Sequence, residues 1–432
     1  MAEIEKIIEE SGSRKVEAKA NDEMLLDEYF QLTPYKANRW DVLMLGITTV
    51  LGGEYYGWTS AFTSGFGSFS IGQFLMGLAY IAMMLCFAEM ASALPLKGTI
   101  FFLPISNQTH FSVYVIGGSF AVARVCLGFY GGFLIGAIEL LECILMTSQS
   151  ATYVGNSFTT PEHPRYYWVV CTLFYVGSVL VVNLSDRIFW SMNAIFAALS
   201  FGMLWIFILG SIQYCDFNQW AAYVPSDDAY GNAKHGSADT KSADAWFVGG
   251  VPGFQVWFVN FPLTTSCFAG VEVLALMPAV MKNAKKDLPF AMVGAVLVLF
   301  VSCMVFMVVV ASLPPGLYST SQAAYPMSWS LDRMFNTNDQ VSIGLIMPAQ
   351  IAMGFGFIPC GTRLIISFSE ANLLPAFLHA KTVKVAVVYY CILAYLVSIV
   401  AYYVPAFGDN LPNVAILAAF STYFSQLFGY LM

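Results

Sequence analysis

Apolar runs of about 20 residues, the length that a helix needs to cross a bilayer, recur along this 432-residue chain. Hydrophobic residues make up 58% of the sequence and charged residues only 11%, which is outside the range of ordinary soluble domains. The short alternating segments that build an outer-membrane barrel are not seen. The sequence therefore predicts an all-α membrane protein with ten spans, at residues 41–63, 71–95, 128–152, 166–185, 188–212, 253–277, 289–313, 341–368, 382–404 and 412–432.

The basic residues give a separate test of this arrangement, because cytosolic loops carry an excess of Lys and Arg. If the N-terminus is inside, only four of the 19 Lys and Arg residues fall in outer loops, namely Arg165, Lys234, Lys241 and Arg333. We therefore expect a cytosolic tail over residues 1–40 and a transmembrane domain over residues 41–432. We also expect the plasma membrane rather than an organelle.

The segment 96–116 does not fit a simple span. It is semi-apolar, but Pro104 and several polar residues interrupt it. Lys97, at the start of the segment, and Arg124, after its end, both favour the cytosolic face. The segment is therefore expected to lie at the interface or to enter and leave the membrane on one side.

The cysteines and histidines show no pattern of a metal site or a disulfide framework. Eight of the nine cysteines lie within or beside apolar segments, where Cys behaves as a small buried residue. No nucleophile and base emerge as a set, so the chain is not predicted to be an enzyme. We expect no metal, no cofactor and no nucleic-acid partner; the expected partners are the lipid bilayer and a small molecule.

Acidic residues placed inside the predicted spans are the first candidates for function, because a charge at membrane depth is costly. None has an obvious cationic partner in its own span, so each must be neutral, hydrated or paired with another helix or a ligand. These acids are Glu54, Glu89, Glu139, Glu142 and Glu272.

Glycines precede two of these acids, in the first and the sixth span. Gly52 and Gly53 come directly before Glu54, and Gly270 comes two residues before Glu272. Glycine lowers helix propensity by about 1 kcal/mol, and broken backbone at membrane depth is tolerated where it lines a polar cavity. Paired interruptions in corresponding positions of two halves indicate the binding site of a transporter.

More ordinary interpretations remain open for the same residues. A membrane glycine often serves close helix packing, and Glu54 can lie at an aqueous end. Glu139 and Glu142 share one helix face, where a structural hydrogen bond is about as plausible as contact with a ligand. The aromatic residues Tyr55, Tyr56, Trp58 and Phe268 either pack in the core or cover an organic cation.

Four stretches of the sequence resemble the amino acid–polyamine–organocation (APC) permeases, and most closely their ethanolamine permease-like branch. The first is GGEYYGW at Gly52–Trp58, similar to the first-span signature of that branch. The others resemble the approach to span 3, the signature of span 6 with its inner loop, and the end of span 8. They are GGSFAVARVCLGFYGGFLIGAIELLE (Gly117–Glu142), CFAGVEVLALMPAVMKNAKKDLPFA (Cys267–Ala291) and GTRLIISFSEANLLPAFL (Gly361–Leu378).

The resemblance implies the LeuT-type fold, an inverted five-plus-five repeat with substrate held at the unwound parts of spans 1 and 6. It implies secondary transport by alternating access, often coupled to protons. The family usually has twelve spans, so we expect a chain truncated at its C-terminus to ten. Segment 96–116 separates two stretches that family members join directly, which suggests an insertion or a gene-model error.

The leading hypothesis is a secondary active transporter of small amino acids or organic amines such as ethanolamine, coupled to protons. The alternative is a receptor or partner subunit that has the permease fold and does not transport. The predicted substrate contacts are Gly52, Gly53, Glu54, Tyr55, Trp58, Phe268, Ala269, Gly270 and Glu272, with Glu139 and Glu142 as coupling or structural carboxylates.

Overall fold

The computed structural model describes the membrane domain in several stretches. These are residues 35–56, 58–93, 99–102, 112–115, 118–159, 166–223, 246–247, 250–323, 325–375, 378–380 and 382–431. Most of the predicted tail, residues 1–34, lies outside the described residues.

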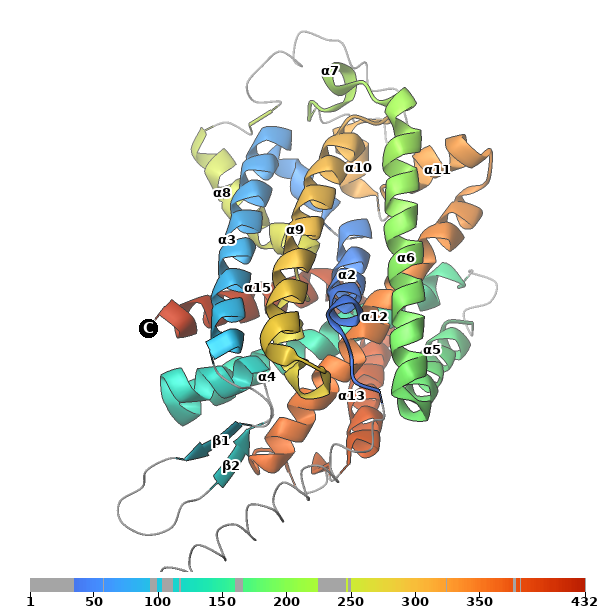
Figure 1. Ribbon diagram of the computed structural model, residues 1–432. Coiled ribbons are helices and arrows are strands. Elements are labelled where there is room, and N and C mark those ends of the chain that lie inside the picture. The colour runs from blue at the N-terminus through green and yellow to red at the C-terminus, as the bar shows by residue number, and fades with distance from the viewer. Residues whose placement is uncertain are drawn as a thin grey trace, which may run out of the picture.

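The described residues are almost entirely helical (Figure 1). Seven helical segments are long and apolar enough to cross a membrane, fewer than the ten spans predicted. They are Phe66–Met90 within α3 (Phe66–Ala93), Leu127–Ser157 within α4 (Gly118–Ser157), α5 (Tyr166–Leu184), Asp186–Tyr214 (α6, Asp186–Ser211, with the short η2, Ile212–Tyr214), α9 (Ala284–Ala311), α12 (Asp339–Glu370) and α13 (Val383–Tyr403).

The first and sixth predicted spans are not among the seven, because neither is one continuous helix. The α2 helix (Arg39–Tyr55) has 17 residues and gives way to a short 3-10 helix, η1 (Thr59–Ser64). In the sixth, α8 (Gly250–Asn260) has 11 residues and leads into η5 (Phe261–Cys267). At the tenth predicted span, α15 (Leu411–Leu431) has 21 residues.

Short helices also lie between these elements in the described stretches. They are α7 (Phe217–Trp220), η6 (Glu272–Leu276), η7 (Pro278–Val280), α10 (Leu317–Gln322), α11 (Ser328–Phe335) and α14 (Pro405–Gly408).

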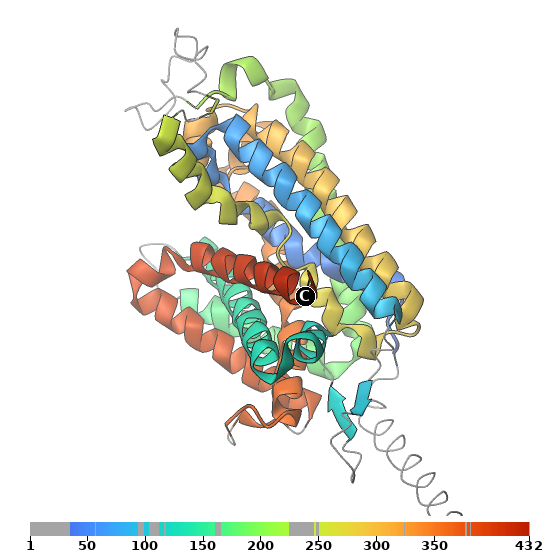
Figure 2. The same ribbon diagram turned by 90° about the vertical axis from the view of Figure 1, so that its left-hand side faces the viewer.

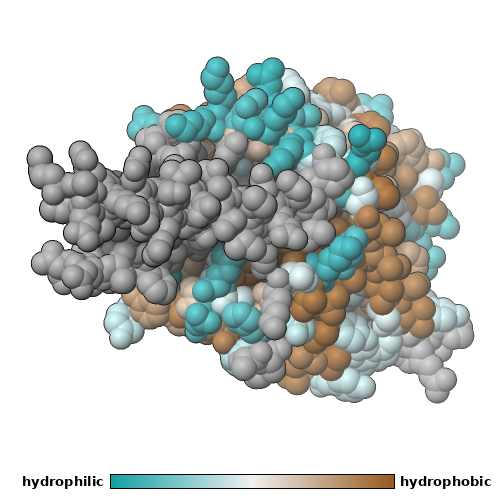
Figure 3. All heavy atoms as spheres, turned by 60° about the horizontal axis from the view of Figure 1, so that its bottom comes forward, coloured by the Kyte–Doolittle hydropathy of each residue, from teal (hydrophilic) through white to brown (hydrophobic). Residues whose placement is uncertain are grey.

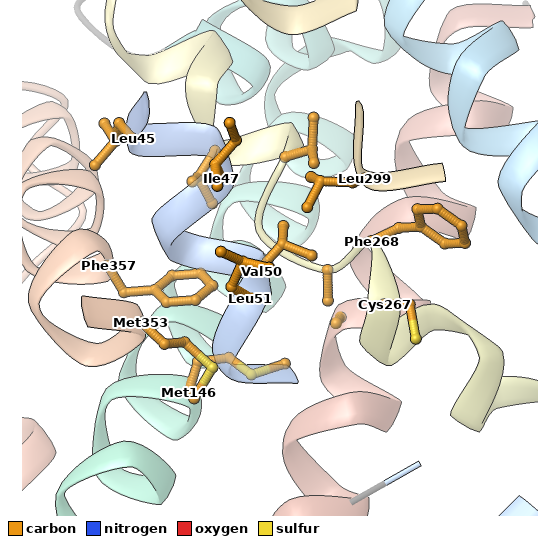
Figure 4. Close-up of a cluster of buried hydrophobic side chains, with 14 of the residues drawn as sticks. Leu45, Ile47, Val50, Leu51, Met146, Cys267, Phe268, Leu299, Met353 and Phe357 are labelled. Carbon is orange, nitrogen blue, oxygen red and sulfur yellow. The ribbon is translucent and has the colours of Figure 1, made fainter. Parts of the chain in front are cut away.

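The α2 helix lies in the middle of the molecule, packed against α6, α9 and α12. In the turned view, α15 runs alongside α4, while α3 and α9 form a separate tilted pair (Figure 2). Buried side chains of α2 meet those of α12 and η5 at the centre of the core (Figure 4). The interrupted first span is therefore surrounded by continuous helices, which fix its position.

The segment predicted to stay on one side of the membrane contains two short strands. β1 (Thr99–Phe102) pairs antiparallel with β2 (Ser112–Val115), and Thr99 lies opposite Val115. Each strand has four residues, less than half of the 9–11 that a membrane-spanning strand needs. The pair lies at the lower end of the molecule in Figure 1, and β2 contacts α12.

Large apolar side chains point outward from the long helices, as expected for contact with lipid. Leu173 on α5, Leu209 on α6 and Phe258 on α8 are each more than 60% exposed. Seen from its lower end, the molecule carries clusters of hydrophilic side chains next to hydrophobic ones (Figure 3). In water these apolar residues would form an aggregating surface, whereas a bilayer covers them.

The chain before α2 is bonded to the chain after the sixth span. Ala37 forms a parallel bridge with Met281, because its N–H donates to Val280 (2.9 Å) and its carbonyl accepts from Lys282 (2.9 Å). The next residue, Asn38, caps α2 and exchanges hydrogen bonds with Asp41. The starting end of α2 is thus attached to the segment that follows η7.

Candidate substrate site

The first interruption begins after Tyr55, not at the glycines. Tyr56 is extended (φ −141°, ψ 148°), and the indole Nε1 of Trp58 donates to the Glu54 carbonyl at 2.6 Å. The prediction that Gly52 and Gly53 open the helix is therefore wrong, because the helix continues through both. The carbonyl groups at its end find partners in the residues that follow.

Gly52 and Gly53 instead allow neighbouring segments to come close. A Cβ on Gly53 would lie 2.3 Å from the Ser266 carbonyl oxygen, and one on Gly52 would lie 2.6 Å from the Cβ of Met353. The Gly52 carbonyl also accepts from Nε2 of Gln350 at 3.2 Å. The alternative interpretation, close packing, therefore explains why both positions are glycine.

The second interruption lies at Phe268–Val271, where the chain is not helical between η5 and η6. Gly270 has φ +107°, and its N–H donates to Oε2 of Glu272 at 3.0 Å. The hydroxyl of Thr49 on α2 donates to the Gly270 carbonyl at 3.1 Å. The predicted interruption at Gly270 is thus present, and a side chain of the first span holds it.

Four of the five acids predicted inside spans, Glu54, Glu139, Glu142 and Glu272, are fully buried, whereas Glu89 on α3 is exposed. Oε1 of Glu54 accepts from the Ser302 hydroxyl of α9 at 3.3 Å, and its Oε2 has no hydrogen-bond partner. Glu272 uses Oε2 for the Gly270 N–H, and its Oε1 has no partner. Glu139 and Glu142 are buried on α4, and both oxygens of Glu142 lack a partner.

The predicted aromatic residues are packed against other rings. Trp58 stacks on Phe69 (centroids 5.5 Å apart), and Phe268 stacks on Tyr80 (5.4 Å). The Tyr55 hydroxyl donates to the Ser200 carbonyl of α6, and Ala269 is 3% exposed. These residues close both interruptions in the state described, and their contact with a substrate stays a prediction.

Comparison with known proteins finds a permease of similar sequence. No protein-family model matches the chain. The branched-chain amino acid permease BcaP of Bacillus subtilis is 24% identical over 356 residues, which are 78% of this chain and 67% of that protein.

Two solved structures share its architecture. One is MhsT in complex with L-phenylalanine, with a TM-score of 0.57 and 12% identity, covering 91% of this chain and 88% of MhsT. The other is a Na⁺-coupled sialic acid symporter in a substrate-bound outward-open state, with a TM-score of 0.52 and 13% identity, covering 93% of this chain and 80% of the symporter. The chain has the LeuT fold of these two structures, and its sequence is similar to that of a permease. BcaP is a permease and the sialic acid protein a symporter, and neither is an enzyme. Together with the seven long apolar helices, they indicate a multi-pass integral membrane protein.

Several polar residues at the two interruptions of this LeuT-fold chain were not predicted from the sequence. Thr49, Ser302 and Gln350 each hydrogen-bond to the residues around the two interruptions. Tyr153 of α4 and Tyr325 pack on Tyr56, with centroids 4.9 and 5.3 Å away. Their signal was weak, because single Thr, Ser and Gln residues are common in membrane helices, where they bond to neighbouring helices.

Proposed function

We propose that the chain is a secondary active transporter of a small amino acid or organic amine, working by alternating access. The observation that carries the proposal is that the two interrupted spans meet. Gly53 packs against the Ser266 backbone, and Thr49 binds the Gly270 carbonyl. Interrupted helices that meet at membrane depth offer a ligand backbone groups that a continuous helix cannot.

The chemistry of the interruptions favours a substrate with an ammonium group. Glu54 and Glu272 are buried and each has a carboxyl oxygen without a partner. A buried carboxylate is stabilised by a cation or by protonation. We propose that these two acids contact the ammonium group, with backbone at Phe268, Ala269 and Gly270 orienting the rest of the ligand.

Amino acids are the first substrates to test. BcaP is named for branched-chain amino acids, and the MhsT structure contains L-phenylalanine. Ethanolamine, which lacks a carboxylate, remains a candidate through the resemblance of Gly52–Trp58. For coupling we propose protons, because the interruptions contain buried acids. We propose an N-terminus in the cytosol and the plasma membrane as the location.

A transport assay with the full chain tests this function. The purified protein is placed in proteoliposomes, and uptake of labelled leucine, phenylalanine and ethanolamine is measured under a pH gradient, a Na⁺ gradient or neither. We expect saturable uptake of at least one compound, driven by the pH gradient. Binding without flux for every compound would support the receptor alternative instead.

The variant Glu54→Gln tests the proposed ammonium contact. Glutamine keeps the size of the side chain and an oxygen that can accept from Ser302, but it removes the charge. We expect uptake to fall by more than about tenfold, since one tenfold step corresponds to about 1.4 kcal/mol of lost binding. Thermal stability in detergent should be unchanged or higher, because an unpaired buried carboxylate is costly.

Ser302→Ala is the matched control for Glu54→Gln. It removes the hydrogen bond to Glu54 and keeps the charge, so its cost should be about 1 kcal/mol of stability, with uptake close to wild type. Undiminished uptake in Glu54→Gln would remove Glu54 from the site.

A further inference from the structure

A second group of buried polar side chains lies next to the sixth-span interruption, and the proposed substrate contacts use only Glu272 from it. We call this group the carboxyl cluster. All its members are at most 3% exposed. They are Tyr80 of α3, Glu142 of α4, Glu272 of η6, and Thr422, Tyr423 and Gln426 of α15.

The two glutamates form the centre of the carboxyl cluster. Helix α4, which carries Glu142, packs against η6, which carries Glu272, and against α15, which carries Thr422. The two carboxyl groups are close enough to influence each other's charge. Tyr80 lies near both glutamates. Its ring stacks on that of Tyr423, with the centroids 4.4 Å apart. The carboxyl groups therefore meet between α4 and the residue directly after the interruption.

The carboxyl cluster contains more polar atoms than it pairs. Both oxygens of Glu142, Oε1 of Glu272 and the hydroxyls of Tyr80 and Tyr423 have no hydrogen-bond partner of standard geometry. The amide group of Gln426, one turn beyond Thr422, is also unpartnered. Buried polar groups are almost always satisfied, so this many open atoms in one place point to a missing ligand.

Two ionised carboxylates cannot form a hydrogen bond with each other. Each only accepts hydrogen bonds, whereas a protonated carboxyl group donates one. Two negative charges brought together in a buried site also repel strongly, which favours protonation of one of them.

The neighbouring titratable groups do not relieve this repulsion. Among the described residues, the titratable groups near the pair include Tyr80, Glu139, Cys143, Cys360 and Tyr423, none of which is a cation. The cation nearby on α12, Arg363, donates to Met277 and to the Pro359 carbonyl.

We propose that Glu142 and Glu272 share one proton, and that this proton is the ion that moves with the substrate. The inference rests on the transport function proposed above and gives its coupling ion a location. One carboxyl group donates its O–H to the other, so the pair carries a single negative charge. An ammonium group bound at Glu272 then neutralises that charge.

This charge balance explains how proton and substrate are linked. With both bound, the pair and the ammonium group together carry no net charge, so this part of the site can change conformation without moving a net charge through a region of low dielectric. Without the proton the centre keeps two carboxylates against one ammonium group. The substrate-loaded transporter therefore reorients readily only when the proton is bound as well.

The test compares two modes of transport in proteoliposomes that contain the full chain, with labelled leucine as the probe. Exchange of internal for external substrate needs no net proton movement, whereas accumulation under a pH gradient does. In Glu142→Gln we expect exchange to remain and accumulation to fall by more than about tenfold, which is within the usual range for coupling between sites. Glu89→Gln, at an exposed carboxylate of α3, is the control and should accumulate as wild type does.

Infrared spectroscopy tests the shared proton without relying on transport. The substrate-free wild type should show the C=O stretch of a protonated carboxyl group at neutral pH, and both Glu142→Gln and Glu272→Gln should lose it. If no such band depends on these residues, the shared proton is ruled out.

The outcomes separate the two proposals. No exchange of any tested compound by the wild type would overturn the transport function. Exchange by the wild type together with wild-type accumulation by Glu142→Gln would leave transport standing and overturn the coupling role of the pair. Accumulation driven by a Na⁺ gradient and indifferent to pH, or loss of exchange in correctly folded Glu142→Gln, would also overturn it.

Discussion

Gly270→Ala is expected to abolish uptake. The backbone of Gly270 has φ +107°, a conformation that an L side chain adopts only at a cost of roughly 1–2 kcal/mol. The new Cβ would also lie 2.9 Å from the Phe357 ring and 3.1 Å from Cβ of Thr49. Relief of these contacts would move both the N–H that binds Glu272 and the carbonyl that accepts from Thr49.

The measurement is uptake in proteoliposomes, together with thermal stability in detergent. Gly202→Ala is the control, since nothing lies within 4 Å of a Cβ at that position on α6. We expect the control to be as active as wild type and slightly more stable, because alanine favours a helix more than glycine does. Normal uptake by Gly270→Ala would show that the geometry of the second interruption does not matter for transport.

Gly53→Ala should be the most destabilising single change at the interruptions. Its Cβ would lie 2.3 Å from the carbonyl oxygen of Ser266, and that oxygen belongs to backbone that has no rotamer to change. Inserting a methyl group into a packed core usually costs about 1–3 kcal/mol, and here the first and sixth spans must move apart. We expect a lower yield of monodisperse protein, a lower melting temperature and little uptake.

Thermal unfolding followed by size-exclusion chromatography in detergent checks this prediction. The same Gly202→Ala control applies, because both positions are helical glycines in apolar spans and only Gly53 touches another segment. A melting temperature equal to that of wild type would mean that the two spans are not in contact at Gly53 in the membrane.

Much of the fold could be predicted from the sequence, because a bilayer demands long apolar helices and leaves few alternatives. The predicted spans 166–185 and 382–404 lie within about two residues of α5 and α13. The LeuT-type fold followed from the motifs at Gly52–Trp58 and Cys267–Ala291. The interruption at Gly270 was also predicted, since glycine there precedes a buried acid.

The location of the first interruption could not be predicted in this way. Glycine lowers helix propensity, but in a membrane it also allows helices to approach closely. Gly52 and Gly53 serve close packing here, because they contact Met353 and Ser266, which are about 300 and 210 positions away in the sequence. The partners of Glu142 were hidden for the same reason: residues of α3, η6 and α15 surround it, and no local pattern connects those segments.

The bridge between Ala37 and Met281 has a consequence for motion. Two backbone hydrogen bonds tie the chain entering α2 to the chain leaving the sixth span, while Gly53 and Thr49 join the same spans deeper in the membrane. Because the first and sixth spans are bonded to each other at two levels, we expect them to move together. In the proposed alternating-access cycle, this pair would tilt as one unit against the helices around it, and the proposed binding groups would keep their spacing.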